Sequence, residues 1–391
     1  MSVSPEALLF RRSVWDSRIP VAVTFDISQL PPGSDVTLDT YYTAAPRVSY
    51  LTLLLADVRK YLVDQVIEPS ALSKLSEKDF WFECEGMPLK WHWPIGLLYD
   101  CFLGSSDRTR HVPPAASSLD DDCGPRAGPS SYANLPWRIK LHIREPPMDK
   151  LYSSCGLDGC RASFMSRIKE ADFVRFGNTK RVVNLRRQEQ DALWDGVIEQ
   201  DFDKYWSVAA KLVPPPSSVA PPISRQSSRA PSLLGGAGLE DRAFLTNHAN
   251  ESQTSLAPSL ASNAPSEVPS ATGPAGANAG LTTNANKDAN AARAVPIRFH
   301  LPDNAPLVQE PVAPLLEDGR PATLQSTLSA LFPLLFPPPP AFRLGTIASP
   351  NLAYPVVHGI VVPLESEISW LGSTFTSADG WLSVVIVLAA H

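Results

Sequence analysis

Cysteine is scarce in this chain, and the few cysteines do not fall into a recognisable pattern. The sequence of 391 residues holds five, Cys84, Cys101, Cys123, Cys155 and Cys160. An odd and small number excludes the dense disulfide framework of a small secreted domain. There is no Cys-x-x-Cys pair, and Cys155 with Cys160 lacks a second pair to complete four zinc ligands. We expect neither a metal nor a cofactor.

Long hydrophobic runs and an excess of positive charge are also missing. No apolar run approaches the roughly 20 residues of a membrane-spanning helix, and residues 1–5 show no basic-then-apolar signal architecture. The net charge of −6 argues against a general nucleic-acid binder, which would carry a basic domain. We therefore expect a cytoplasmic protein without a nucleic-acid partner.

Familiar catalytic motifs are absent as well. We find no glycine-rich phosphate loop, no paired-carboxylate motif and no serine nucleophile elbow. A thiol enzyme using Cys155 or Cys160, with His142 or His92 as the base, stays open as an alternative. Isolated cysteines are more often small packed residues, so we expect no catalytic role and no enzyme.

Proline is abundant, and its uneven distribution divides the chain. Proline accounts for 39 of the 391 residues, roughly twice the ordinary usage of about 5%. Residues 214–293 are dominated by Ala, Ser, Pro, Asn and Gly with a single aromatic, Phe244. Such a segment buries too little apolar surface to offset its chain entropy, so we predict a disordered linker there. A second serine- and proline-rich stretch, 104–134, predicts an insertion loop.

The remaining segments predict three folded domains of an α+β protein. Residues 1–150 read as an N-terminal helix followed by strand, helix, hairpin, short helix and strand, the order of a ubiquitin-like β-grasp domain. Residues 151–213 read as helical, with one long helix over 188–212. Residues 294–391 repeat the β-grasp order, with strands at 295–301, 356–362 and 381–388 and helices at 323–332 and 367–375. His358 is placed within a strand, in a packing or hydrogen-bonding role.

One lysine stands at the margin of an amphipathic helix. On a helical wheel Phe164, Ile168 and Ala171 share one arc, and Lys169 lies just beyond it. The lysine stem can cover apolar surface while its amine reaches water. By itself this pattern is typical of an ordinary surface lysine. It is also compatible with a covalent acceptor, because the nitrogen is accessible and its position is defined.

The sequence resembles the autophagy-related protein 5 family over nearly everything outside the linker. The order and spacing of the matching stretches carry the resemblance: Val14-Trp15, Arg18–Pro20, Tyr41-Tyr42, Pro46–Leu51, Pro88–His92, Pro94–Leu98, Pro136-Trp137, the helix Phe164–Asp172, Leu193-Trp194, Phe202-Asp203, Trp206 and Val357–Gly359. The chain departs from the family mainly by insertion, at 104–134 and in the long linker.

The resemblance implies an acceptor in a ubiquitin-like conjugation system. In this family the matching lysine, Lys169, receives autophagy-related protein 12 through an isopeptide bond. The conjugate binds the coiled-coil protein autophagy-related protein 16, works with E2-like conjugating enzymes and acts like an E3 ligase in the lipidation of autophagy-related protein 8 with phosphatidylethanolamine. Residues 389–391, Ala-Ala-His, lack a terminal glycine, which also favours an acceptor over a donor. The implied location is the cytoplasm, with peripheral association at the preautophagosomal membrane.

Two further surfaces are hypotheses from the residues. Leu8, Leu9 and Phe10 in the first helix are expected to receive an amphipathic helix of the coiled-coil partner; packing inside the first domain is the alternative. Several basic residues form a patch that would meet anionic lipid or an acidic partner: Arg175, Lys180, Arg181, Arg186 and Arg187. A β-grasp adaptor that binds partners without being modified remains the alternative function.

Overall fold

The computed structural model describes residues 5–30, 39–67, 73–106, 135–152, 156–214, 292–303, 305–338 and 351–389. All of them belong to one compact unit of the chain. They form a mixed α+β fold in which two five-stranded sheets flank a helical region, as the sequence predicts. The predicted linker, apart from its first residue and its last two, and most of the predicted insertion loop lie outside the described residues.

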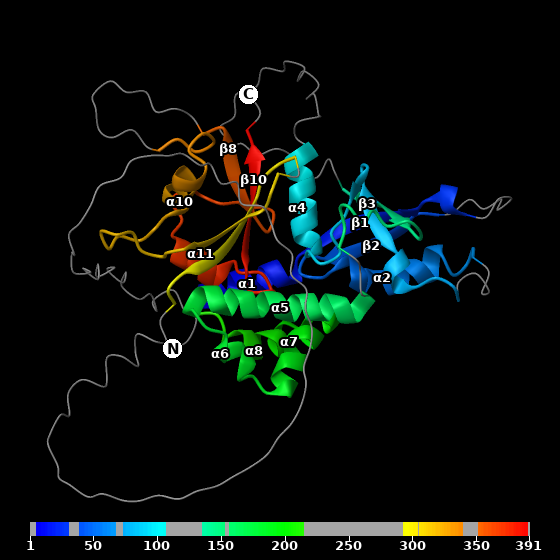
Figure 1. Ribbon diagram of the computed structural model, residues 1–391, viewed down its shortest axis with the longest axis horizontal. Coiled ribbons are helices and arrows are strands. Elements are labelled where there is room, and N and C mark those ends of the chain that lie inside the picture. Colours follow the sequence, from blue (N-terminus) through cyan, green and yellow to red (C-terminus); the bar gives the residue numbers. More distant parts are fainter. Residues whose placement is uncertain are drawn as a thin grey trace, which may run out of the picture. The chain divides into compact units, whose positions relative to one another are not determined.

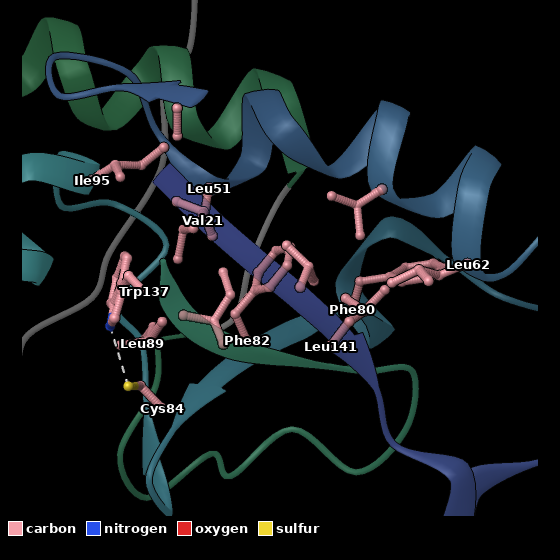
Figure 2. Packing of buried hydrophobic residues seen from close by; sticks show 14 of the residues in the cluster. Val21, Leu51, Leu62, Phe80, Phe82, Cys84, Leu89, Ile95, Trp137 and Leu141 are labelled. Carbon is pink, nitrogen blue, oxygen red and sulfur yellow. Dashed lines mark hydrogen bonds between the residues drawn. The ribbon is translucent and has the colours of Figure 1, made fainter. Parts of the chain in front are cut away.

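The first sheet has the strand order β2-β1-β5-β3-β4. Its central strands β1 and β5 run parallel, and the remaining neighbours are antiparallel. Helix α2 crosses this sheet (Figure 1) and buries Leu51, Val58 and Leu62 in a core that also contains Phe82 and Trp137. Figure 2 shows this packing. The elements are α1 (Pro5–Asp16), β1 (Arg18–Phe25), β2 (Tyr41–Pro46), α2 (Leu51–Leu62), β3 (Trp81–Cys84), β4 (Met87–Pro88), α4 (Ile95–Ser106) and β5 (Trp137–His142).

The second sheet repeats this arrangement, with the order β7-β6-β10-β8-β9 and a central parallel pair β6 and β10. The elements are β6 (Val295–His300), β7 (Val308–Val312), α10 (Leu324–Leu331), β8 (Ala353–Val357), β9 (Ile360–Val361), α11 (Ile368–Thr374) and β10 (Leu382–Leu388). A central parallel pair with antiparallel outer strands and a helix after the first two strands is the β-grasp arrangement in both domains.

The helical region consists of α5 (Gly156–Phe176), α6 (Lys180–Val183), α7 (Arg187–Glu199) and α8 (Phe202–Ala209). Figure 1 shows the three shorter helices gathered along α5. Their common core contains Phe164, Leu193, Trp194 and Val197, together with Trp15 from α1.

Three expectations about local structure are wrong. The single helix predicted over 188–212 is two helices, because Gln200 adopts φ 59° and the Asp201 side chain caps α8 by accepting from the Lys204 N–H at 3.0 Å. His358 and Gly359 do not lie within a strand; with φ values of 51° and 79° they form the turn between β8 and β9. Helix α4 extends to Ser106, into the predicted insertion loop.

Candidate functional site

Helix α5 carries Lys169 and is anchored along one side by aromatic packing. The Phe164 ring lies 5.2 Å from the ring of Trp194 and 6.4 Å from that of Tyr50, centroid to centroid. Ile168 and Ala171 continue this buried side. Burial of large aromatic side chains on one face fixes the rotation of the helix about its axis.

Lys169 itself is exposed to solvent. Among the described residues it makes no ion pair and no hydrogen bond. Its helical neighbours at i−4 and i+4 are Met165, which is half-buried, and Phe173, which is 57% exposed. The adjacent carboxylate of Glu170 is engaged by Arg298 of β6, Nη2 to Oε2, at 3.2 Å. The amine of Lys169, on a helix packed along one side, is therefore available to a partner.

The same buried side of α5 carries charges that face the C-terminal domain. Arg167 donates from Nη1 to Oδ2 of Asp379 at 3.2 Å, and the Trp381 indole donates to the Arg167 carbonyl at 3.2 Å. Arg175 donates to the carbonyl of Gly380. Burial lowers the pKa of Arg175 to about 10, and its guanidinium remains charged at neutral pH. These contacts join the buried side of α5 to the C-terminal domain.

The expected basic patch loses one member. Arg175 is 3% exposed, so its assignment to a surface patch is wrong. Its charge is used inside the protein, where the Gly380 carbonyl accepts its hydrogen bond. Arg181 is half-buried, with its guanidinium carbon 3.8 Å from the centroid of the Phe176 ring. Lys180, Arg186 and Arg187 are exposed. A patch of these four remains a prediction.

Helix α1 packs on the C-terminal domain and on the helical region. The alternative expectation placed its apolar residues inside the first domain. Phe10 contacts the rings of Trp370 and Phe375, at centroid distances of 6.1 and 5.9 Å. Trp15 stacks on Tyr205 of α8 at 4.7 Å. Leu8 and Leu9 are exposed, Leu9 by 68%. Packing of Leu9 and Phe10 inside the first domain is therefore excluded, and the partner-binding role stays a prediction.

The described cysteines and histidines do not form a catalytic pair. Burial raises the pKa of the Cys160 thiol to about 12, against a hydrogen bond from Thr52 that lowers it. The His142 ring lies between the carboxylates of Asp26 and Glu83, at 3.1 and 3.0 Å. The pKa of His92 falls to about 3, first through burial and then through nearby cations.

Cys155, the other candidate nucleophile, lies outside the described residues. No cluster of three or more metal-ligating side chains occurs within the parts of the chain that the structure describes. No helix in the same ranges has the length and apolar character to cross a membrane.

The sequence did not predict a role for Asp379 and Arg298, which form contacts between domains. Their contacts with α5 join residues more than 100 positions apart in the chain, and nothing local marks them. His358 was expected to pack or to form a hydrogen bond, and this is confirmed by its Nε2 contact with the Phe375 carbonyl at 2.8 Å.

Two β-grasp domains around a helical region define a class of protein built from ubiquitin-like parts. Three family models match the chain in order: the UblA domain of autophagy protein ATG5 over residues 14–143, its alpha-helical bundle region over 157–215 and its UblB domain over 294–386. The chain belongs to the autophagy protein 5 family.

Full-length relatives agree with the domain matches. Autophagy protein 5 of Aspergillus fumigatus is 30% identical over 378 residues, covering 96% of this chain and 94% of the relative. Autophagy protein 5 of Neosartorya fischeri is 29% identical over 386 residues with the same coverage. The crystal structure of Kluyveromyces marxianus Atg5 superposes with a TM-score of 0.56 at 17% identity, over 97% of this chain and 99% of that one, and shows the same fold.

Proposed function

We propose that this protein is a non-catalytic scaffold of autophagy whose Lys169 accepts autophagy-related protein 12 through an isopeptide bond. Membership of the autophagy protein 5 family supports the pathway. The observation that carries the site is an exposed lysine without an intramolecular partner among the described residues, on a helix whose buried side is held by aromatic packing and by the buried Arg167–Asp379 ion pair.

For this reaction the chain has only to hold the amine of Lys169 in an accessible position. The deprotonated Nζ of Lys169 attacks the thioester carbonyl between the donor's terminal glycine and the cysteine of a conjugating enzyme. The new C–N bond replaces the C–S bond, the thiol leaves and the nitrogen loses a proton. The exposed flank of α5 leaves the amine open to such a large partner. The conjugate would then bind the coiled-coil autophagy-related protein 16 and act E3-like in the lipidation of autophagy-related protein 8 with phosphatidylethanolamine.

The test is a conjugation assay with matched lysine variants. Lys169→Arg should abolish the heat- and thiol-stable shifted band, because arginine keeps the charge and length but does not deprotonate to a nucleophile at a working pH. Lys150→Arg and Lys180→Arg change lysines that are equally exposed and should leave the band in place. Mapping of the branched peptide to Lys150 or Lys180 would refute the assignment.

The same assay separates the alternatives. An adaptor that is never modified would show no stable band in wild-type protein. A thiol enzyme would lose function when Cys155 and Cys160 are both replaced by serine, whereas the scaffold should retain it. Burial of Cys160 favours the scaffold.

We further propose that the conjugate works in the cytoplasm and at the preautophagosomal membrane. Lys180, Arg181, Arg186 and Arg187 would supply attraction of about 1 kcal/mol each to an anionic surface. Flotation with vesicles containing anionic lipid should fall when the three exposed members, Lys180, Arg186 and Arg187, are replaced by glutamine.

A further inference from the structure

A cavity of about 210 Å³ opens in the first β-grasp domain between the β3–β4 hairpin and helix α4. Its wall is largely apolar, with Met87, Leu89, Leu98, Phe102 and Trp93, and it also carries one carboxylate, Glu85, and one ammonium, Lys90. Figure 2 shows Leu89 at this end of the core, beside Cys84, whose sulfur accepts from the Trp137 indole at 3.2 Å. None of the proposed conjugation chemistry uses this cavity.

One cation lines the cavity without an anionic partner. Lys90 is half-buried, and its Nζ lies 4.1 Å from the centroid of the Trp93 ring. Burial lowers its pKa, partly offset by the neighbouring Cys101. Among the described residues Lys90 forms no ion pair with a carboxylate. A desolvated ammonium beside an apolar cavity favours a ligand that brings a negative charge.

The volume of the cavity and the sheet edge beside it limit which kinds of ligand can bind. This volume suits a short hydrocarbon chain and lies below the roughly 300–1,000 Å³ of pockets that take drug-sized ligands or cofactors. β4 is the outer strand of its sheet, but Pro88 has no N–H, so this edge lacks a continuous row of donors for an added peptide strand.

We propose that this cavity binds a free medium-chain fatty carboxylate, with its hydrocarbon chain between the β3–β4 hairpin and α4 and its carboxylate at Lys90. The apolar wall contributes through area removed from water, and the carboxylate supplies the counter-charge that Lys90 lacks. The site is independent of conjugation at Lys169, so either assignment can fail without the other.

The sequence offers a direct probe of this binding. The chain has four methionines, and Met87 lines the cavity. In full-length protein carrying ¹³C-methyl methionine, decanoate below its micelle concentration should shift the Met87 signal in a saturable, one-to-one manner. Met148 and Met165 are outside the cavity and serve as internal references. Decanol should bind at least tenfold more weakly, and decyltrimethylammonium should not shift Met87.

Variants then test the named contacts. Lys90→Met should weaken decanoate binding at least tenfold, while Lys60→Met, which removes the same charge from an exposed position on α2, should leave it unchanged. Cys101→Phe places a larger side chain in the wall and should prevent binding; if it does not fold, the lysine pair still decides the question.

Several outcomes would overturn the proposal. They are equal affinity for decanoate and decanol, equal effects of Lys90→Met and Lys60→Met, or shifts of all methionine signals together. Lys90-dependent flotation with phosphatidic acid vesicles, without any binding of decanoate, would assign the site to a membrane lipid and reject the free carboxylate.

Discussion

Arg167 on helix α5 and Asp379 before strand β10 form a buried ion pair across 212 positions of sequence. The distance from Nη1 to Oδ2 is 3.2 Å, and the side chains are 10% and 3% exposed. Arg298 of β6 approaches the same carboxylate at 3.7 Å. The helix that presents Lys169 is thus joined to the C-terminal domain by charges that water does not screen.

Arg167→Met should destabilise the protein by about 3 kcal/mol, because it leaves Asp379 buried with a single cation. Arg161→Met is a matched control on the same helix; its ion pair with Asp191 is 43% and 37% exposed and should be worth less than about 1 kcal/mol. Urea unfolding of both variants measures the difference. Equal losses in the free energy of unfolding would show that burial of the Arg167–Asp379 pair does not make its removal more destabilising.

Gly380→Ala should loosen the contact between α5 and the C-terminal domain. Gly380 has φ +88°, and a Cβ there would lie 2.9 Å from the Cβ of Ala171. We expect a loss of roughly 2–4 kcal/mol from backbone strain and overpacking together. Gly319→Ala is the control, since φ is +82° but nothing lies within 4 Å, so it reports strain alone. A thermal shift no larger than that of the control would contradict the packing argument.

Leu9→Asp should weaken binding of the coiled-coil partner while the protein stays folded. Leu9 is 68% exposed, so the substitution should change stability by no more than about 0.5 kcal/mol. Phe10→Asp should in addition destabilise the protein, because Phe10 packs on Trp370 and Phe375. Calorimetry with a peptide of autophagy-related protein 16 and thermal melts separate the two effects. Unchanged affinity for Leu9→Asp would remove this helix from the interface.

Acid should destabilise the protein through buried histidines. Burial, with Arg298 nearby, lowers the pKa of His300 from 6.5 to about 3, and burial beside Arg47 lowers that of His358 to about 4. Between these pKa values and pH 6.5 the unfolded chain binds more protons than the folded protein. The contribution of the two histidines to the free energy of unfolding is therefore fully present above pH 6.5 and is lost as the pH drops. At pH 5 each histidine should cost roughly 2 kcal/mol relative to pH 7.

Urea unfolding at pH 7 and pH 5 measures this loss. His300→Gln should reduce the difference between the two pH values by roughly 2 kcal/mol, because glutamine does not titrate. A wild-type stability that is flat over this range would show that the histidines are not held neutral by the fold.

The sequence by itself determined most helices and strands, because these depend on local periodicity. Alternation predicted β1 and β5, and the apolar arc of α5 placed Lys169 at its margin, where the structure shows it exposed. The short strand β7 was missed because its pattern is weak and its formation depends on pairing with β6. Stretches with a strong internal pattern were predictable without knowledge of their neighbours.

Only the tertiary structure decided where buried charges and helix breaks fall. The periodic pattern continues through Gln200, yet the chain turns there so that α8 packs on α7, with Gly196 close enough for its missing Cβ to lie 2.8 Å from that of Tyr205. The sequence predicts Arg175 to be a surface cation. In the structure it is buried and donates to the carbonyl of Gly380, which is 205 positions away in the chain. A charge is buried only where a partner offsets its desolvation, and partners distant in sequence meet only in the folded chain.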